Sequence, residues 1–178
     1  TLSSACNNNT WYEITVKREP RGLFSRWLFE KHSASELFRI SKPSGNYYLP
    51  DDQQQDVVCL MGGIGITPAI SMCRSLEGKQ RAYRLHLDYS VSSPAEQIAA
   101  EEFARLSAAD NLLTHRVRFT RSEGRITQSD IRDLVKAYPN ATFFLCAGEA
   151  YLQTVSDYLR QAGVTEQQIR IEIFTPAV

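Results

Sequence analysis

The chain has 178 residues, of which 43% are hydrophobic and 22% are charged. These fractions are close to those of ordinary globular domains, and they exclude a disordered, collagen-like or coiled-coil chain. Twenty basic residues balance twenty acidic ones, so charge gives no reason to expect a nucleic-acid partner or an anionic membrane surface. The longest apolar runs, such as residues 57–61, are far too short to span a bilayer.

The four cysteines predict free thiols rather than a metal or redox motif. They stand at positions 6, 59, 73 and 146, and no Cys-x-x-Cys pair occurs. This spacing is not that of a zinc ribbon, a dithiol redox motif or an iron–sulfur cage. Because Cys59 and Cys146 lie inside apolar runs, we expect buried thiols, and four free thiols favour a reducing, cytoplasmic location.

The first part of the chain, residues 1–53, is predicted to be rich in strands with one helix. Alternating residues that include β-branched and aromatic side chains indicate half-buried strands, and Pro and Gly residues separate them. The expected elements are a strand over 11–17, a helix over 23–31, a strand over 37–41, a turn over 43–46 and a strand over 47–49.

The second part, residues 54–178, alternates between strand and helix patterns. The expected strands are 57–61, 83–89, 112–119, 141–146 and 169–174, and the expected helices are 67–77, 94–106, 128–138 and 149–162. Thr127 with Asp130 forms a capping-box variant, and Gly163 ends the last helix. This alternation predicts an α/β domain with a five-stranded, parallel, doubly wound sheet.

A glycine-rich turn, Gly62 to Pro68, follows the first buried strand and opens a helix. Its glycines, Gly62, Gly63 and Gly65, let the backbone turn tightly and approach a phosphate. We expect Thr67 to cap the helix and Pro68 to suit its first turn. The free N–H groups and the positive helix end then favour a pyrophosphate, and the alternative is a glycine-rich turn without a ligand.

Two residues near the ends of later strands are candidate site residues. Cys146 closes a predicted strand and is followed by a small-residue turn that includes Gly148, at the sheet edge where doubly wound folds bind ligands. The alternative is a small buried thiol. Glu172 alternates with isoleucines and therefore points away from them, and the alternative there is a solvated edge glutamate.

Several motifs in order resemble the ferredoxin–NADP reductase superfamily, and most closely the reductase modules of flavohaemoglobins and of oxygenase reductases. Together they cover nearly the whole chain, and the ordered set is far more specific than any one motif. The motifs are Val16–Pro20 with Gly22–Leu28, Pro43-x-Gly45 with Tyr47–Pro50, Gly62–Pro68, Cys146, and Glu172-x-Phe174.

The resemblance implies an FAD-binding β-barrel, of which residues 1–53 are a part, before an NAD(P)-binding domain of residues 54–178. Thr1 to Ala5 is similar to the tail of the family's Arg-x-Tyr-Ser/Thr flavin motif, which implies that about half of the barrel precedes Thr1. Thr1 would lie near flavin N5. The other residues to which the resemblance gives a role at the flavin are Lys17, Gly22, Phe24, Ser25, Glu172 and Phe174.

On the nucleotide side, the resemblance implies that the glycine-rich turn binds the pyrophosphate and that Cys146 borders the nicotinamide. The chain departs from the family where Cys146-Ala147-Gly148 replaces Cys-Gly-Pro. It also has Ser92 where many relatives have an arginine. Ser92 with Arg121 offers a place for a 2′-phosphate, and the choice between NADH and NADPH stays open.

The expected function is a flavoprotein oxidoreductase module. It would transfer a hydride from NAD(P)H to FAD and pass electrons to an acceptor that the chain does not identify: a haem, an iron–sulfur domain, an oxygenase or free flavin. One alternative is a truncated nucleotide-binding module that neither holds flavin nor turns over by itself. Another is a flavin-independent α/β nucleotide binder, which would leave the flavin-like motifs unexplained.

Overall fold

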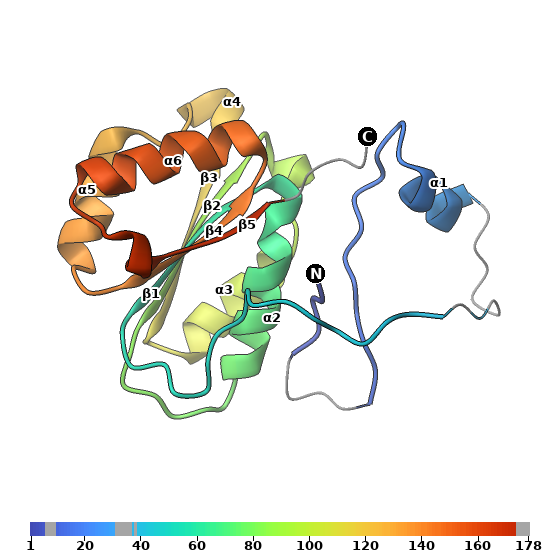
Figure 1. The fold of residues 1–178 in the computed structure, drawn as a ribbon, viewed down its shortest axis with the longest axis horizontal. Coiled ribbons are helices and arrows are strands. Elements are labelled where there is room, and N and C mark those ends of the chain that lie inside the picture. Colours follow the sequence, from blue (N-terminus) through green and yellow to red (C-terminus); the bar gives the residue numbers. More distant parts are fainter. Residues whose placement is uncertain (6–9, 31–36, 38, 174–178) are drawn as a thin grey trace.

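A five-stranded, all-parallel sheet forms the centre of the computed structural model, which describes residues 1–5, 10–30, 37 and 39–173. The strand order is β3-β2-β1-β4-β5 (Figure 1). The predicted α/β, doubly wound fold is therefore confirmed. The strands are β1 (Val57–Gly62), β2 (Leu85–Val91), β3 (Leu113–Phe119), β4 (Thr142–Ala147) and β5 (Ile169–Ile173).

Helices cover both faces of this sheet (Figure 1). Side chains of α2 and α3 form one core with the sheet, and side chains of α5 and α6 form another on the opposite face. The α-helices are α1 (Leu23–Glu30), α2 (Thr67–Leu76), α3 (Ala100–Ala109), α4 (Thr120–Glu123), α5 (Gln128–Ala137) and α6 (Glu149–Gln161). Short 3₁₀ helices span Gly63–Ile66, Pro94–Glu96 and Glu166–Gln168.

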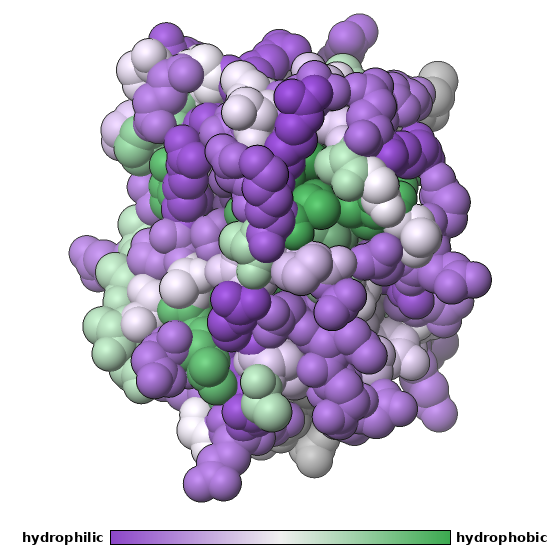
Figure 2. Space-filling view, turned by 90° about the vertical axis from the view of Figure 1, so that its left-hand side faces the viewer, coloured by the Kyte–Doolittle hydropathy of each residue, from purple (hydrophilic) through white to green (hydrophobic). Residues whose placement is uncertain are grey.

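The central strand β1 and its neighbour β4 are almost entirely apolar because both of their faces are buried. In β1, Cys59 and Met61 belong to the core under α2 and α3, whereas Val58 and Leu60 belong to the core under α5 and α6. All four side chains are completely buried. The outer surface shown in Figure 2 is mostly hydrophilic, with apolar residues only in limited patches.

The predicted helix over 94–106 is wrong in its first half. Pro94–Glu96 forms a single 3₁₀ turn, Gln97 is extended, and α3 begins only at Ala100. Ala99 has φ +57°, a left-handed conformation that an α-helix cannot contain. Ile98 and Ala99 instead pack against the core under α3.

The first part of the chain contains fewer strands than predicted. Helix α1 is confirmed over Leu23–Glu30, but the expected strands over 11–17, 37–41 and 47–49 do not form ladders among the described residues. The pairing described there is one isolated antiparallel bridge between Leu2 and Ile14. A strand needs a neighbour for its backbone groups, and outside this bridge these segments have none within the described residues.

Apolar side chains of the first part are also exposed. Trp11, Ile14, Leu23 and Phe24 are 54%, 47%, 90% and 52% exposed. Figure 1 shows α1 set apart from the sheet, beyond the extended N-terminal segments. The predicted partial barrel over 1–53 and the boundary at residue 53 stay predictions.

Candidate functional site

The strand order of the sheet reverses between β1 and β4. From β1 the chain continues to β2 on one side, and from β4 it continues to β5 on the other side. Ligands of open α/β sheets bind where the strand order reverses in this way. The glycine-rich turn leaves β1 at this point, and the Ala147-Gly148 turn leaves β4 beside it.

The three glycines of the turn have different physical roles. Gly63 has φ +55° and open space where a Cβ would stand, so it permits the turn and leaves its outer side accessible. Gly62 and Gly65 face β4 instead. A Cβ on Gly62 would lie 2.8 Å from the Ala147 Cβ, and one on Gly65 would meet the Cys146 carbonyl. Glycine at these two positions therefore permits close packing against β4, and the role of the three glycines in phosphate approach stays a prediction.

Helix α2 begins at Thr67, as predicted, but its N-terminal cap differs from the prediction. Ile66 is the N-cap residue and Thr67 is the first helical residue, so the expected Thr67 cap is wrong. The preceding 3₁₀ turn moves Thr67 into the helix. Its side chain is buried, and its hydroxyl has no hydrogen-bond partner among the described residues. Pro68 lies in the first turn, as predicted.

The three predicted catalytic residues come together from distant parts of the chain. Cys146 in β4 and Glu172 in β5 are register partners on neighbouring strands. The Thr1 hydroxyl donates a hydrogen bond of 3.4 Å to the Glu172 carboxylate. Thr1 is exposed and Glu172 half-buried, so this pair borders solvent at the sheet edge.

Cys146 is completely buried. Burial raises the pKa of its thiol to about 12, and the nearby Glu172 carboxylate adds to that shift. The thiol is therefore neutral at physiological pH. Tyr47 lies over the same region, with its ring 5.4 Å from that of Phe144 in an edge-to-face contact. Burial also raises the pKa of Tyr47, and the nearby Cys146 and Glu172 side chains add to that shift.

The predicted flavin segment forms the start of α1. The Gly22 amide donates to the Glu19 carbonyl, and the buried Ser25 hydroxyl accepts a hydrogen bond from the Glu19 amide. A Cβ at Gly22 would lie 2.5 Å from the Ser25 hydroxyl, so a side chain here would displace that hydroxyl from the Glu19 amide. Lys17 forms an exposed ion pair of 3.2 Å with Glu19.

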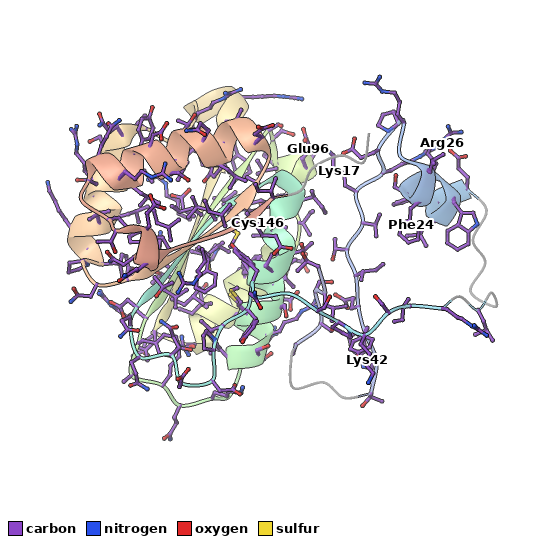
Figure 3. All side chains as sticks on the ribbon, viewed as in Figure 1. Lys17, Phe24, Arg26, Lys42, Glu96 and Cys146 are labelled. Atoms are coloured by element: carbon purple, nitrogen blue, oxygen red, sulfur yellow. The ribbon has the colours of Figure 1, made fainter. Side chains whose placement is uncertain are left out.

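Phe24 is half exposed, and its ring is stacked on Trp27 with centroids 5.9 Å apart. Figure 3 shows Phe24 and Arg26 on α1, away from Cys146 at the sheet. The structure therefore does not bring this segment to the Cys146 site. Phe174, the other predicted flavin contact, lies outside the described residues.

Ser92 and Arg121 are brought together, as the predicted 2′-phosphate site requires. The Arg121 amide donates to the Ser92 carbonyl at 3.2 Å. The exposed Arg121 side chain also pairs with Glu96 at 3.5 Å. Glu96 was not foreseen, because it lies in the stretch that was predicted to be helical.

A buried ion pair below the same edge was also missed. Gly62, Ser90 and Arg118 are register partners across β1, β2 and β3. Arg118 lies 3.7 Å from Asp88 and 3.3 Å from Asp130, and its side chain is 4% exposed. Burial raises the pKa of Asp88 against the opposing effect of Arg118. Charged residues at alternate positions of β2 and β3 were the available signal.

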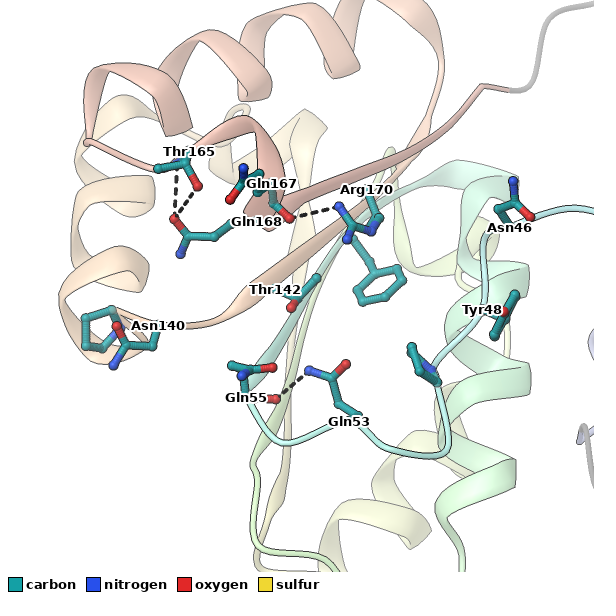
Figure 4. A pocket seen from close by; sticks show the side chains of 13 residues that line it. Asn46, Tyr48, Gln53, Gln55, Asn140, Thr142, Thr165, Gln167, Gln168 and Arg170 are labelled. Carbon is teal, nitrogen blue, oxygen red and sulfur yellow. Dashed lines mark hydrogen bonds between the residues drawn. The ribbon is translucent and has the colours of Figure 1, made fainter.

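Two hollows border the sheet. A cavity of about 940 Å³ runs along α2, between the segment 43–54, the N-terminal residues and the segment 79–83 before β2, and Thr1 and Glu172 line it. A second hollow of about 650 Å³ lies at the amino ends of β4 and β5 (Figure 4). Its polar groups bond to the chain itself, for example Gln53 to the Gln55 carbonyl and Arg170 to the Gln167 carbonyl. The carboxyl edge stays the candidate site because the strand order reverses there and because Thr1, Cys146 and Glu172 meet there.

Two further observations concern metal binding and membrane-spanning helices. The described residues contain no group of three or more His, Cys, Asp or Glu side chains that could hold a metal ion. Within the same residues, no helix combines the length and apolar character needed to cross a membrane.

Comparisons with known proteins agree with the resemblance seen in the sequence. No family model matches the chain. A flavohemoprotein from Halalkalibacterium halodurans is 28% identical over 94% of the chain and 45% of its own length. The ferredoxin reductase component of a 3-ketosteroid-9-alpha-monooxygenase from Mycolicibacterium smegmatis is 27% identical over 97% of the chain and 49% of its own length. The chain thus spans about half the length of the curated relatives it matches.

Solved structures agree on the fold. The FAD/NAD-binding domain of a nitric oxide dioxygenase from Vibrio cholerae has a TM-score of 0.78 at 24% identity, over 99% of this chain and 76% of that one. A cytochrome P450 reductase from Amycolatopsis has a TM-score of 0.81 at 20% identity, over 99% of this chain and 56% of that one. The predicted resemblance is confirmed: the relatives are flavohemoproteins and a ferredoxin reductase component, and the structural neighbours are reductase domains.

Proposed function

We propose that this chain is part of an NAD(P)H-dependent flavin oxidoreductase, in which residues 54–178 bind the nicotinamide nucleotide and residues 1–53 contribute to the FAD site. The observation that carries the proposal is the meeting of Thr1, Cys146 and Glu172 at the carboxyl edge beside the glycine-rich turn. These groups are far apart in sequence, and the relatives that share this fold include reductase components.

The nucleotide side fits a pyrophosphate. Gly63 leaves open space above a turn whose backbone continues into α2, so its amides and the positive helix end face an anion from one side. The buried Thr67 hydroxyl lacks a partner among the described residues, which suits a polar group arriving at this turn. Gly148 is the N-cap of α6 and also has open space at its Cβ position. Gly62, Gly65 and Pro68 would hold the shape of the turn.

The adenosine end would lie over Ser92 and Arg121. These residues follow β2 and β3 on the side of the sheet away from Cys146. Arg121 supplies a cation for a 2′-phosphate, whereas Glu96 beside it supplies an acceptor for a 2′-hydroxyl. This end of the site therefore offers a partner to either NADH or NADPH.

The segment with a predicted role at the flavin forms a turn and exposes apolar side chains, and both features suit a bound flavin. Gly22 and Ser25 build a fixed turn at the start of α1, Lys17 supplies a cation before it, and Phe24 offers an exposed ring. We propose that this segment binds the FAD pyrophosphate. The flavin would then cover part of the exposed apolar side chains of the first part.

Bound FAD would accept the hydride of the nicotinamide and pass electrons onward to a separate acceptor. The chain's own residues would align the donor with the acceptor, which is the main catalytic contribution of such a site. The Thr1 hydroxyl would orient the flavin edge, and the Glu172 carboxylate would set the charge beside it. Cys146, held neutral by burial, would form a small polarisable wall at the nicotinamide.

Haem and oxygenase proteins are the classes of acceptor that fit this proposal. The curated relatives include flavohemoproteins and an oxygenase's reductase component. We propose that electrons pass to a haem or oxygenase partner of this kind.

A second candidate function has one observation in its favour. Among the described residues, the first part of the chain pairs through one isolated bridge and does not form a barrel wall. This favours a module that binds the nucleotide but does not hold flavin by itself.

Flavin titration of the full chain separates the two candidates. We expect added FAD to give a flavin absorption band that stays with the protein through gel filtration and is bleached anaerobically by NADH or NADPH. A chain that stays colourless but binds NADH would support the second candidate. A chain that binds neither FAD nor nucleotide would refute both.

A further inference from the structure

Arg74, in the third turn of α2, joins three parts of the chain. Its guanidinium forms two hydrogen bonds with the Glu102 carboxylate of α3, at 2.6 and 2.9 Å. It also donates to the Ser3 carbonyl at 2.8 Å and to the Glu13 carboxylate. The Arg74 side chain is 25% exposed, so these charge-assisted bonds are partly shielded from water.

The partners of Arg74 in the N-terminal segment, Ser3 and Glu13, are themselves tied together. The Ser3 amide donates to the Glu13 carbonyl at 2.8 Å, and the Ser3 hydroxyl donates to the Glu13 carboxylate at 3.1 Å. The Ser71 hydroxyl, one turn before Arg74, donates to the Ser4 carbonyl at 2.7 Å. Ser3 and Ser4 are completely or almost completely buried. The segment is thus fixed on α2 by polar groups rather than by an apolar core.

This attachment point lies next to the candidate catalytic residues. Thr1 stands two residues before Ser3, and two residues span at most about 7 Å. A fixed Ser3 therefore keeps the Thr1 hydroxyl within reach of Glu172, to which it donates at 3.4 Å. If Ser3 and Glu13 leave α2, Thr1 loses the anchor that holds it at the end of β5.

We propose that Arg74 is a positioning residue that holds the N-terminal segment on α2 and thereby aligns Thr1 with Glu172. Its catalytic consequence rests on the proposed function, because Thr1 and Glu172 are assigned there to the flavin. Arg74 touches neither of them and acts through Ser3 and Glu13.

Arginine is the side chain that this position requires. Its planar fork binds Glu102 with two donors while a further nitrogen reaches Glu13 and the Ser3 carbonyl. A lysine at position 74 has a single ammonium group and cannot make the two-pronged contact. Hydrogen bonding from Arg74 lowers the pKa of Glu13, so the carboxylate stays charged at neutral pH.

The chain offers a matched control. Arg105 of α3 pairs with Glu77 just after α2, so it also links the region of α2 to α3 through an arginine and a glutamate. Among the described residues, this pair forms no hydrogen bond or ion pair with the N-terminal segment. Arg105→Met therefore removes an arginine–glutamate pair, more exposed than that of Arg74 and Glu102, without removing the anchor. Glu13→Gln removes the negative charge of one N-terminal partner and leaves Arg74 with Glu102 and the Ser3 carbonyl, which covers the case in which Arg74→Met fails to fold.

The first readout does not depend on flavin. Amide hydrogen exchange of Ser3, followed by NMR in the full chain, should be about tenfold faster in Arg74→Met and in Glu13→Gln, which corresponds to about 1.4 kcal/mol. It should be unchanged in Arg105→Met. Equal exchange in wild type and both anchor variants would overturn the proposal, even if flavin binding had been demonstrated.

The second readout separates alignment from affinity. In the FAD-loaded chain, Arg74→Met and Glu13→Gln should slow flavin reduction at saturating nucleotide by about 10- to 100-fold, since small misplacements of reacting groups cost that much. The dissociation constant for NADH should change by less than about twofold, because the anchor lies outside the glycine-rich turn. A reduction rate equal to that of wild type would overturn the role in alignment. Failure of wild type to take up FAD would count against the proposed function alone, and the exchange measurement would still test the anchor.

Discussion

Gly65 gives the sharpest test of how the glycine-rich turn is built. A Cβ at this position would lie 2.5 Å from the carbonyl carbon of Cys146 and 3.0 Å from the Ala147 nitrogen, and closer still to the Cys146 oxygen. These are backbone atoms of the buried strand β4, so no side chain can rotate to make room. Overpacking in a core typically costs 1–3 kcal/mol. We expect Gly65→Ala to lie at or above the upper end, at about 3 kcal/mol.

Urea unfolding followed by far-ultraviolet circular dichroism measures this loss. Gly148→Ala is the matched control, because a Cβ there meets nothing within 4 Å and its φ is −70°. We expect that control to cost less than about 1 kcal/mol, the usual effect of a poorer N-cap residue. If Gly65→Ala unfolds within about 0.5 kcal/mol of wild type while losing nucleotide affinity, the packing argument is refuted and Gly65 serves the ligand directly.

Three further outcomes follow from two buried groups and from one helix cap. In a Cys6→Ser background, the thiol reagent DTNB should react with the native chain at pH 8 only as fast as the chain unfolds, and rapid labelling would contradict this. The free energy of unfolding should also fall as pH rises from 9 toward 12, because the raised pKa of Cys146 penalises the thiolate in the folded state only. Arg118→Met should cost about 3–5 kcal/mol in urea unfolding because Asp88 is left buried without its cation, and an effect below about 1 kcal/mol would argue against the ion pair. Thr127→Ala should cost about 1 kcal/mol in the same assay through loss of the capping box that begins α5, and no loss would mean that the cap is formed but unimportant.

The α/β part of the fold could be predicted because its signals are local. Continuous apolar runs identify β1 and β4, since both faces of these strands are buried. The Thr127 capping box and the turn at Gly163 set helix boundaries within a residue or two. The prediction was wrong between residues 94 and 99, where packing of Ile98 against the core overrides the helical pattern.

The strands of the first part and the details of the site were harder to predict. A strand pattern does not say whether a partner strand is present. Residues 11–17 therefore looked like a strand, although within the described part of the chain their pairing is limited to the bridge of Ile14 with Leu2. The grouping of Thr1, Cys146 and Glu172 came from the resemblance and not from spacing. Arg74 gave no signal at all, because its partners lie 28, 61 and 71 residues away.

The central claim is that the carboxyl edge of the sheet binds a nicotinamide nucleotide. NMR mapping of the isotope-labelled chain during titration with NADH, and then with NADPH, tests it most directly. The account predicts that the largest shifts fall on the amides of Gly63, Thr67 and Gly148. Shifts confined to the hollow at the opposite edge, around Gln53 and Arg170, would contradict it.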